Sequence, residues 1–169
     1  SDSMKIQSGT FNELAANYGF TFDERDRSFM PTSGSIASFG QSFPIYADKS
    51  FISNVLRASH YKTLNENIVG AGKFFITTVN AIGADDVRLN KRKSLSSRRL
   101  RGFEKNKVGP VDGKDHIGGN YAAALNFETN LPNLLPEDLN TDVSFFLDFG
   151  NVWGVDYDST LDDSNKIRS

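Results

Sequence analysis

The sequence predicts an all-β fold, an antiparallel meander of six strands with one long loop between the fourth strand and the fifth. Two observations lead to this fold class. Apolar side chains alternate with small or polar ones over six segments of about ten residues, which is the period of a strand with two different faces. Turn-forming residues separate the segments, and no segment has a convincing helical period. A length of 169 residues fits one domain.

The first strand has the clearest alternation. Tyr18, Phe20 and Phe22 share an apolar face, and small or polar residues fill the positions between them. Pro31 and Gly34 supply turn chemistry after this strand. The next three segments are rich in β-branched and aromatic residues, which favour strands. We expect the first four strands at about residues 11–24, 35–46, 51–62 and 72–82.

The alternation stops after the fourth strand. From about residue 83 to residue 119, neither a helical nor a strand period is sustained. A structureless connection of this length is uncommon in a compact domain and is usually functional or disordered. Alternation then resumes in two strands, which we expect at about residues 120–131 and 142–154. Residues 167–169 look like the start of a seventh strand.

Composition excludes several classes of protein. The formal net charge of −2 gives the whole chain no bias toward nucleic acid or acidic membranes. Cysteine is absent, which excludes a disulfide framework and thiolate chemistry. His60 and His116 are too few and too far apart in the sequence for a zinc site, so we expect no metal and no cofactor. The chain has no run of about 18 apolar residues, and Ser1 to Gln7 lack the basic start and apolar core of a signal peptide.

Two all-β architectures fit the alternation, a soluble sandwich and a transmembrane barrel. The polar faces of a sandwich meet water and should carry long charged side chains. Here they carry mainly Ser, Gly, Ala, Asn and Thr, which suit a crowded barrel lumen, and the other faces form an aromatic and aliphatic band that suits lipid. The strands are also longer than the five or six residues of a typical sandwich. The pattern favours a barrel, and a soluble β domain stays open as the alternative.

The long loop contains a basic run from Arg88 to Arg101. Such a run can indicate nucleic-acid binding or nuclear targeting, but no aromatic side chain interleaves it, which weakens a single-strand-binding interpretation. A solvated loop with surplus charge is the simpler explanation. Arg101-Gly102-Phe103 differs from the arginines before it, because glycine permits a sharp turn and the phenylalanine supplies an anchor that buries. The planar guanidinium beside them suits carboxylates.

Two carboxylates downstream can meet that arginine. Glu128 and Asp148 lie on the same class of face, on strands joined by one short turn, so we expect them to be neighbours across the sheet. Two unpaired carboxylates in a lumen would repel each other, and one guanidinium between them removes this repulsion. We therefore predict that Arg101 pairs with both and pins the loop inside a barrel. A carboxylate pair also suits acid–base or glycosidase chemistry, but no nucleophile, metal-ligand cluster or phosphate loop accompanies it, so we expect no enzyme.

Six motifs, taken in this order, resemble a known family. They are residues 20–27 (FTFDERDR), 29–34 (FMPTSG), 100–103 (LRGF), 109–110 (GP), 118–120 (GGN) and 144–153 (SFFLDFGNVW). From about Tyr18 to Ser169 the chain resembles the bacterial surface antigen family, the outer-membrane assembly proteins of the BamA type. The loop motif is short by itself, and its combination with the segment after it makes the resemblance specific.

The resemblance implies a place for the motif Leu100, Arg101, Gly102 and Phe103. In the family, this motif lies on the sixth extracellular loop, which folds back into the lumen. Its arginine contacts carboxylates on the next two strands, which by position are Glu128 and Asp148. Leu100 stands where the family has valine, an apolar change that we expect to be tolerated. The residues implied to support the motif are Gly109, Pro110, Gly118, Gly119, Asn120, Phe146 and Gly150.

The resemblance also implies a domain and a function. The family barrel has roughly sixteen strands, so residues 1–169 would be a fragment of the C-terminal outer-membrane barrel, with no POTRA domain. The implied function is part of an insertase that folds and inserts β-barrel proteins into the outer membrane of a Gram-negative bacterium. Its partners would be outer-membrane lipids, unfolded barrel clients and accessory lipoproteins, with no nucleic acid. The alternatives are the pore of a two-partner secretion or TamA-like transporter and a soluble β-sandwich binding domain.

Overall fold

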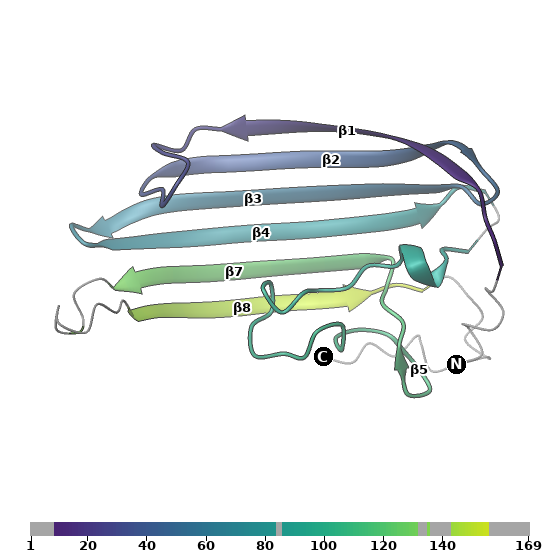
Figure 1. Cartoon of the computed structure of the whole chain (residues 1–169). Helices are drawn as coiled ribbons and strands as arrows, with labels where there is room; N and C mark the ends of the chain where they lie inside the picture. The colour runs from purple at the N-terminus through teal and green to yellow at the C-terminus, as the bar shows by residue number, and fades with distance from the viewer. Residues whose placement is uncertain (1–8, 84–85, 132–134, 136–142, 156–169) are drawn as a thin grey trace.

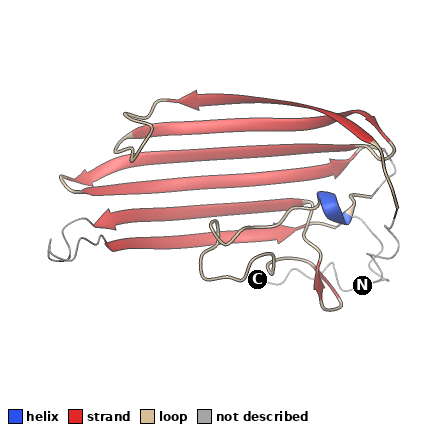
Figure 2. Ribbon diagram, in the orientation of Figure 1, coloured by secondary structure: helices blue, strands red, loops and turns tan. Residues whose placement is uncertain are grey.

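Six long strands form one antiparallel sheet. The computed structural model describes residues 9–83, 86–131, 135 and 143–155. The strands are β1 (Glu13–Asp23), β2 (Gly34–Ala47), β3 (Phe51–Asn65), β4 (Ile68–Ala81), β7 (Tyr121–Leu131) and β8 (Val143–Trp153). They lie side by side in chain order, with β1 and β8 at the edges of the described sheet (Figures 1 and 2). The predicted all-β, antiparallel fold class is confirmed.

The hairpin of β3 and β4 is longer than the sequence pattern indicated. β3 continues to Asn65 and β4 begins at Ile68, whereas we expected an end at residue 62 and a start at residue 72. Gly70 and Gly72 explain the earlier start of β4, because a glycine has no side chain to reveal a face, although its backbone can still pair in a ladder. The end of β3 is longer because Thr63 and Asn65 pair with Val69 and Ile68 of this extended β4. The seventh strand expected at residues 167–169 lies outside the described residues.

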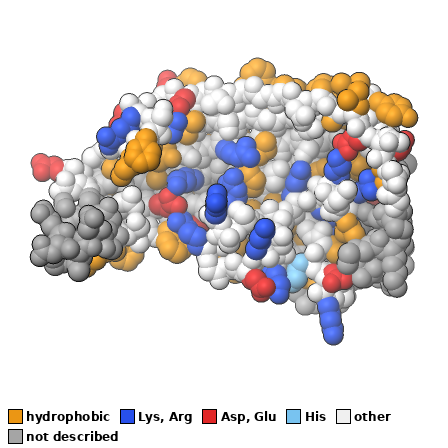
Figure 3. Space-filling model, in the orientation of Figure 1, with side chains coloured by type: hydrophobic (Ala, Val, Ile, Leu, Met, Phe, Trp, Pro, Cys, Tyr) orange, Lys and Arg blue, Asp and Glu red, His pale blue; other side chains and the backbone are white. Residues whose placement is uncertain are grey.

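The two faces of the sheet carry different kinds of side chain. We call the face covered by the long loop the inner face, and the opposite one the outer face. Figure 3 shows the inner side, where Lys and Arg side chains gather over the middle of the sheet. Large apolar side chains stand exposed on the outer face instead: Leu14, Phe20, Phe22, Phe74, Phe127, Phe145, Leu147 and Phe149. Exposure to water costs about 25 cal/mol per Å² of apolar surface, so this face suits lipid as its surroundings.

The buried core lies between the inner face and the long loop. One cluster joins Leu95 and Leu100 of the loop to Phe75, Ala122, Ala124 and Val152 of the sheet, and another joins Val87 to Phe51 and Val79. The loop expected to be structureless also holds a 3-10 turn, η1 (Leu89–Lys91), and a small hairpin of β5 (Val111–Asp112) and β6 (Asp115–His116). Which side chains of the loop are buried depends on where the loop touches the sheet. They are therefore not spaced at a regular interval along the sequence.

The loop crosses the inner face from one edge strand to the other. Lys91 forms an ion pair with Glu13 of β1, and Arg101 pairs with Asp148 of β8. Because β1 and β8 are opposite edges of the described sheet, these two ion pairs fix the loop at both edges. In the described part of the chain, no helix has the length and apolar character needed to span a membrane.

Candidate functional site

Arg101 holds the loop against two strands through its guanidinium. Its Nε and Nη2 donate to the two carboxylate oxygens of Asp148 at 2.7 and 2.6 Å, and its backbone N–H donates to Oδ2 of the same residue at 3.0 Å. Its Nη1 lies 2.9 Å from Oε1 of Glu128. The structure thus brings together the three side chains that the sequence pattern singled out. We call this arrangement of Arg101, Glu128 and Asp148 the latch.

Asp148 is the buried member of the latch. Its side chain is 3% exposed, whereas those of Arg101 and Glu128 are 29% and 28% exposed. Asn126, which lies opposite Asp148 on β7, donates its amide N–H to Oδ1 at 2.8 Å. The same amide nitrogen donates to the carbonyl oxygen of Arg99 at 2.7 Å. A buried carboxylate is tolerated only when it is paired and hydrogen-bonded, and Asn126 and Arg101 together meet this requirement.

The two carboxylates are neighbours across the sheet, as we expected, and they lie on a diagonal of the ladder. In the register of β7 and β8, Glu128 faces Phe146, and Asp148 lies two residues further along β8. The diagonal leaves room for one guanidinium between the two carboxylates. The guanidinium carbon of Arg101 also lies 3.9 Å from the centroid of the Phe146 ring, a cation–π contact. Lys73 of β4 forms an ion pair with the other oxygen of Glu128, so two cations balance the two carboxylates.

The backbone of the loop motif decides which of its apolar side chains is buried. Gly102 has a φ of +84°, a conformation that favours glycine. The turn directs Phe103 away from the sheet, where it is 52% exposed, and Leu100 is the buried residue at 4% exposure. The prediction that Phe103 is the buried anchor is therefore wrong. Gly150 of β8 makes room for the loop, because a Cβ there would lie only 2.7 Å from Cδ1 of Leu95.

The glycines expected to support the motif allow the loop to approach β8 closely. A Cβ on Gly109, whose φ is +108°, would lie 2.7 Å from Cβ of Val152. A Cβ on Gly119 would lie 2.4 Å from the carbonyl oxygen of Trp153. No larger residue fits at either position without moving backbone. The other supporting residues lie in the same stretch: Pro110 and Asn120 are buried, and Gly118 has a φ of +68°.

The basic run before Arg101 rests on the inner face. Nζ of Lys93 donates to Oγ of Ser53 at 2.6 Å, and the guanidinium carbon of Arg99 lies 3.4 Å from the centroid of the Phe75 ring. Burial lowers the pKa of both Lys93 and Arg99. The expectation of a solvated loop with surplus charge is therefore wrong for these residues, because they bind the sheet.

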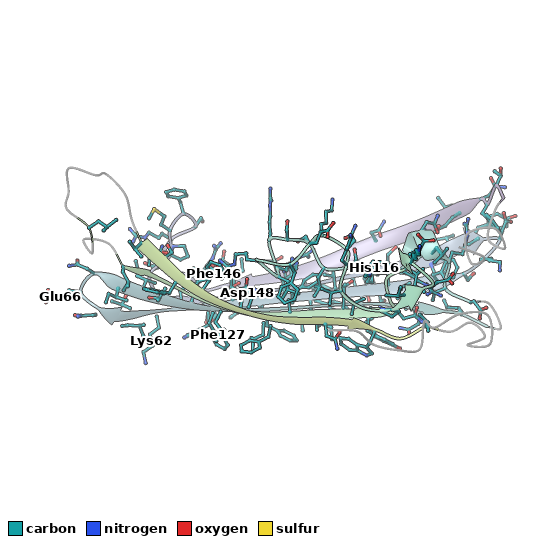
Figure 4. The ribbon with its side chains drawn as sticks, turned by 90° about the horizontal axis from the view of Figure 1, so that it is seen from below. Lys62, Glu66, His116, Phe127, Phe146 and Asp148 are labelled. Atoms are coloured by element: carbon teal, nitrogen blue, oxygen red, sulfur yellow. The ribbon has the colours of Figure 1, made fainter. Side chains whose placement is uncertain are left out.

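Two residues of this site were missed at the level of sequence. Asn126 lies two positions before Glu128 and so shares its face of the strand. This spacing could have identified it. Lys73 begins an apolar run and pairs across β4 and β7 with Asn126, a relation that only the register reveals. Nothing in the described residues forms a group of three or more His, Cys, Asp or Glu side chains that could hold a metal ion. His116 lies in the small β5–β6 hairpin, apart from the latch (Figure 4).

The family of the chain follows from comparison with known proteins. The model of the Omp85 superfamily domain matches residues 1–169. This chain belongs to the Omp85 superfamily. The family resemblance seen in the sequence motifs is thereby confirmed, and the latch is a feature of an Omp85 chain.

Two relatives of this Omp85 chain bear on its role. It is 28% identical over 178 residues to the outer membrane protein assembly factor BamA of Neorickettsia risticii, covering 99% of this chain and 23% of that protein. It is 27% identical over 142 residues to a SAM50-like protein of Schizosaccharomyces pombe, covering 78% of this chain and 29% of that protein. The chain therefore spans between a fifth and a third of the length of these relatives.

A solved structure supports the fold of this Omp85 chain. The crystal structure of BamA from Haemophilus ducreyi lacking POTRA domains 1–3 superposes with a TM-score of 0.73 at 23% sequence identity. The match covers 83% of this chain and 30% of that one. The six-stranded antiparallel sheet is therefore a fold that occurs in a BamA structure.

Proposed function

We propose that this chain is part of the β-barrel of an outer-membrane assembly factor, an insertase that folds and inserts β-barrel proteins into the outer membrane of a Gram-negative bacterium. The latch is the observation that carries the proposal. It fixes the long loop to β7 and β8 on the inner face while the outer face stays apolar. In this arrangement the loop holds the barrel wall in one shape and performs no bond chemistry.

Three findings support the proposal. The chain belongs to the Omp85 superfamily over its whole length, and one relative is an outer membrane protein assembly factor. The outer face exposes large apolar side chains from β1 to β8, as a lipid-facing barrel wall does. The polar, cationic inner face suits a lumen.

The proposal includes a domain assignment and a set of partners. Residues 1–169 would be a segment of the C-terminal barrel, with POTRA domains elsewhere in the parent protein. This assignment is supported by the 23% of the BamA relative that the chain covers. Unfolded β-barrel proteins and outer-membrane lipids would contact the barrel itself, and accessory lipoproteins would bind through the periplasmic domains.

Replacing the latch arginine in the full-length parent tests the proposal. Arg101→Ala leaves the buried Asp148 carboxylate without its main partner, which costs about 3 kcal/mol when such a pair is broken. We expect lower levels of folded β-barrel proteins in the outer membrane and a heat-modifiable band of the parent that unfolds at a lower temperature. Arg98→Ala is the matched control, because Arg98 is an exposed arginine of the same run.

The result also separates the proposal from its alternatives. Normal outer-membrane composition together with an unchanged unfolding temperature in Arg101→Ala would contradict the proposed function. A mutant that loses one secreted substrate while its other barrel proteins are normal would indicate a transport pore of the two-partner secretion or TamA-like kind.

A further inference from the structure

The outer face contains a groove at the end of the sheet opposite the long loop. Its floor is Gly70 and Gly72 of β4, which pair with Lys62 and His60 of β3. With no side chains on this floor, a groove of about 520 Å³ opens between β3 and β8. Figure 4 shows Lys62 and Phe127 pointing to the same side of the sheet, away from the side that holds Asp148.

The walls of the groove are apolar side chains of the neighbouring strands. Leu64 leans over the floor from one side, since its Cδ1 lies 2.9 Å from where a Cβ of Gly70 would be. Phe127 of β7 bounds it on the other side, with ring atoms 3.8 Å from where a Cβ of Gly72 would be. Phe145 and Leu147 of β8 extend that wall, and both are more than half exposed. The shape and chemistry of the groove fit a hydrocarbon chain.

The rim of the groove carries a positive charge. Lys62 is exposed and forms no ion pair with any residue in the described part of the chain. Glu128, the acidic residue that contributes to the lining, has its carboxylate oxygens occupied by Arg101 and Lys73. An ammonium group beside an apolar groove near the end of membrane-length strands is placed to reach a phosphate at the water interface.

We propose that this groove binds one phospholipid with a net negative charge. Its acyl chain lies over Gly70 and Gly72, and its phosphate accepts a charge-assisted hydrogen bond from Nζ of Lys62. The inference rests on the proposed function, because it requires the outer face to meet lipid.

Lipid retention by the full-length parent tests the groove. The purified parent in detergent is mixed with dioleoylphosphatidylglycerol, and the lipid-bound fraction is measured by native mass spectrometry. We expect Lys62→Gln to weaken retention about tenfold, since hydrogen bonds to charged groups are worth more than 1.4 kcal/mol. Gly72→Leu should abolish retention by filling the groove, and the open space around Gly72 accepts the new Cβ without a clash.

Two controls match these variants. Lys114→Gln removes a lysine in the exposed turn between β5 and β6, and Ala16→Leu adds the same apolar bulk to the outer face of β1. Both should retain lipid as the wild type does. Retention that is unchanged in Lys62→Gln, or equally reduced in the controls, overturns the groove site. If Gly72→Leu does not fold, Lys62→Gln still decides, because this exposed substitution touches no packed residue.

Client insertion by the wild-type parent is measured separately, so the two proposals fail in different ways. If the parent inserts its clients normally but all variants retain lipid equally well, the groove site is overturned and the insertase proposal is not. Retention that depends on Lys62 in a parent that inserts no client overturns the insertase proposal and leaves the lipid site supported.

Discussion

Among single residues, Asp148 places the strictest demand on its surroundings. Its carboxylate is 3% exposed and accepts hydrogen bonds from the side chain and backbone of Arg101 and from the amide of Asn126. Leaving such a group unpaired costs far more than one hydrogen bond gains. Arg101 is on the loop and Asn126 is on β7, so a single buried charge on β8 ties three segments together.

Asn126→Asp tests this dependence. The new carboxylate would stand where the amide now donates to Asp148 at 2.8 Å, and its repulsion would oppose the latch. We expect the loop to be destabilised by about 1–3 kcal/mol. Trypsin should then cleave the folded parent faster after Arg99, whose carbonyl oxygen accepts the second hydrogen bond from Asn126.

Asn130→Asp provides the control on the same face of β7. Asn130 accepts a hydrogen bond from Ser144 at 2.7 Å in exposed surroundings, and it does not contact the latch. Its variant should be cleaved at the wild-type rate. Equal cleavage of both variants would show that Asn126 does not secure the loop.

At the scale of elements, the turn between β1 and β2 shows how a short connection fixes a long hairpin. The carboxylate of Asp26 accepts hydrogen bonds from the backbone N–H groups of Thr32 and Ser33 and from the Thr32 hydroxyl. Gly34 begins β2 with a φ of +94°, and a Cβ there would lie 2.2 Å from the carbonyl oxygen of Glu24. The turn therefore depends on one carboxylate and one glycine.

The Asp26 turn should depend on pH. The hydrogen bond from the Thr32 hydroxyl is the main cause that lowers the pKa of Asp26 from 3.8 to about 2. A lowered pKa means that the contribution of Asp26 to stability is present above its ordinary pKa and is lost as the pH falls through about 2. Phe29 and Met30 at the turn are exposed, so pepsin cleavage between them reports on its order.

Wild type and Asp26→Asn are compared at each pH, so that changes in pepsin activity cancel. We expect the wild type to be cleaved more slowly than the variant at pH 4 and at the same rate below pH 2. A constant ratio of the two rates across this range would contradict the role of Asp26.

The strands were predictable from the sequence because their signal is local. Alternation along one segment shows both its conformation and its faces. It missed the start of β4 at Gly70 and Gly72, where side chains are missing, and the end of β3 that pairs with it. The pairing of Arg101 with two carboxylates was predictable in kind, since those carboxylates share a face. The exposure of the Phe103 side chain was not predictable. The conformation of Gly102 decides which side chain meets the sheet, and that conformation depends on the docked loop.

At the scale of the whole molecule, the apolar side chains are arranged the opposite way from a water-soluble sheet. The buried core on the inner side packs Phe51 and Phe75 with smaller residues under the loop, such as Ala122, Ala124 and Val152. Most of the exposed large apolar side chains of the strands stand on the outer face. This arrangement is stable only if lipid or detergent covers the outer face.

Cysteine scanning along β8 tests which medium meets each face. The 169 residues contain no cysteine, so each single substitution introduces the one thiol of this segment, and any cysteine elsewhere in the parent is first replaced by serine. Ser144→Cys lies on the inner face, where a water-soluble maleimide should label it. Phe145→Cys and Leu147→Cys lie on the outer face, where lipid should protect them in intact membranes. Detergent should expose the two protected positions without changing the label at residue 144. Equal labelling of the adjacent residues 144 and 145 in the membrane would mean that both faces of β8 meet water. This result would contradict the barrel assignment and favour a soluble sheet.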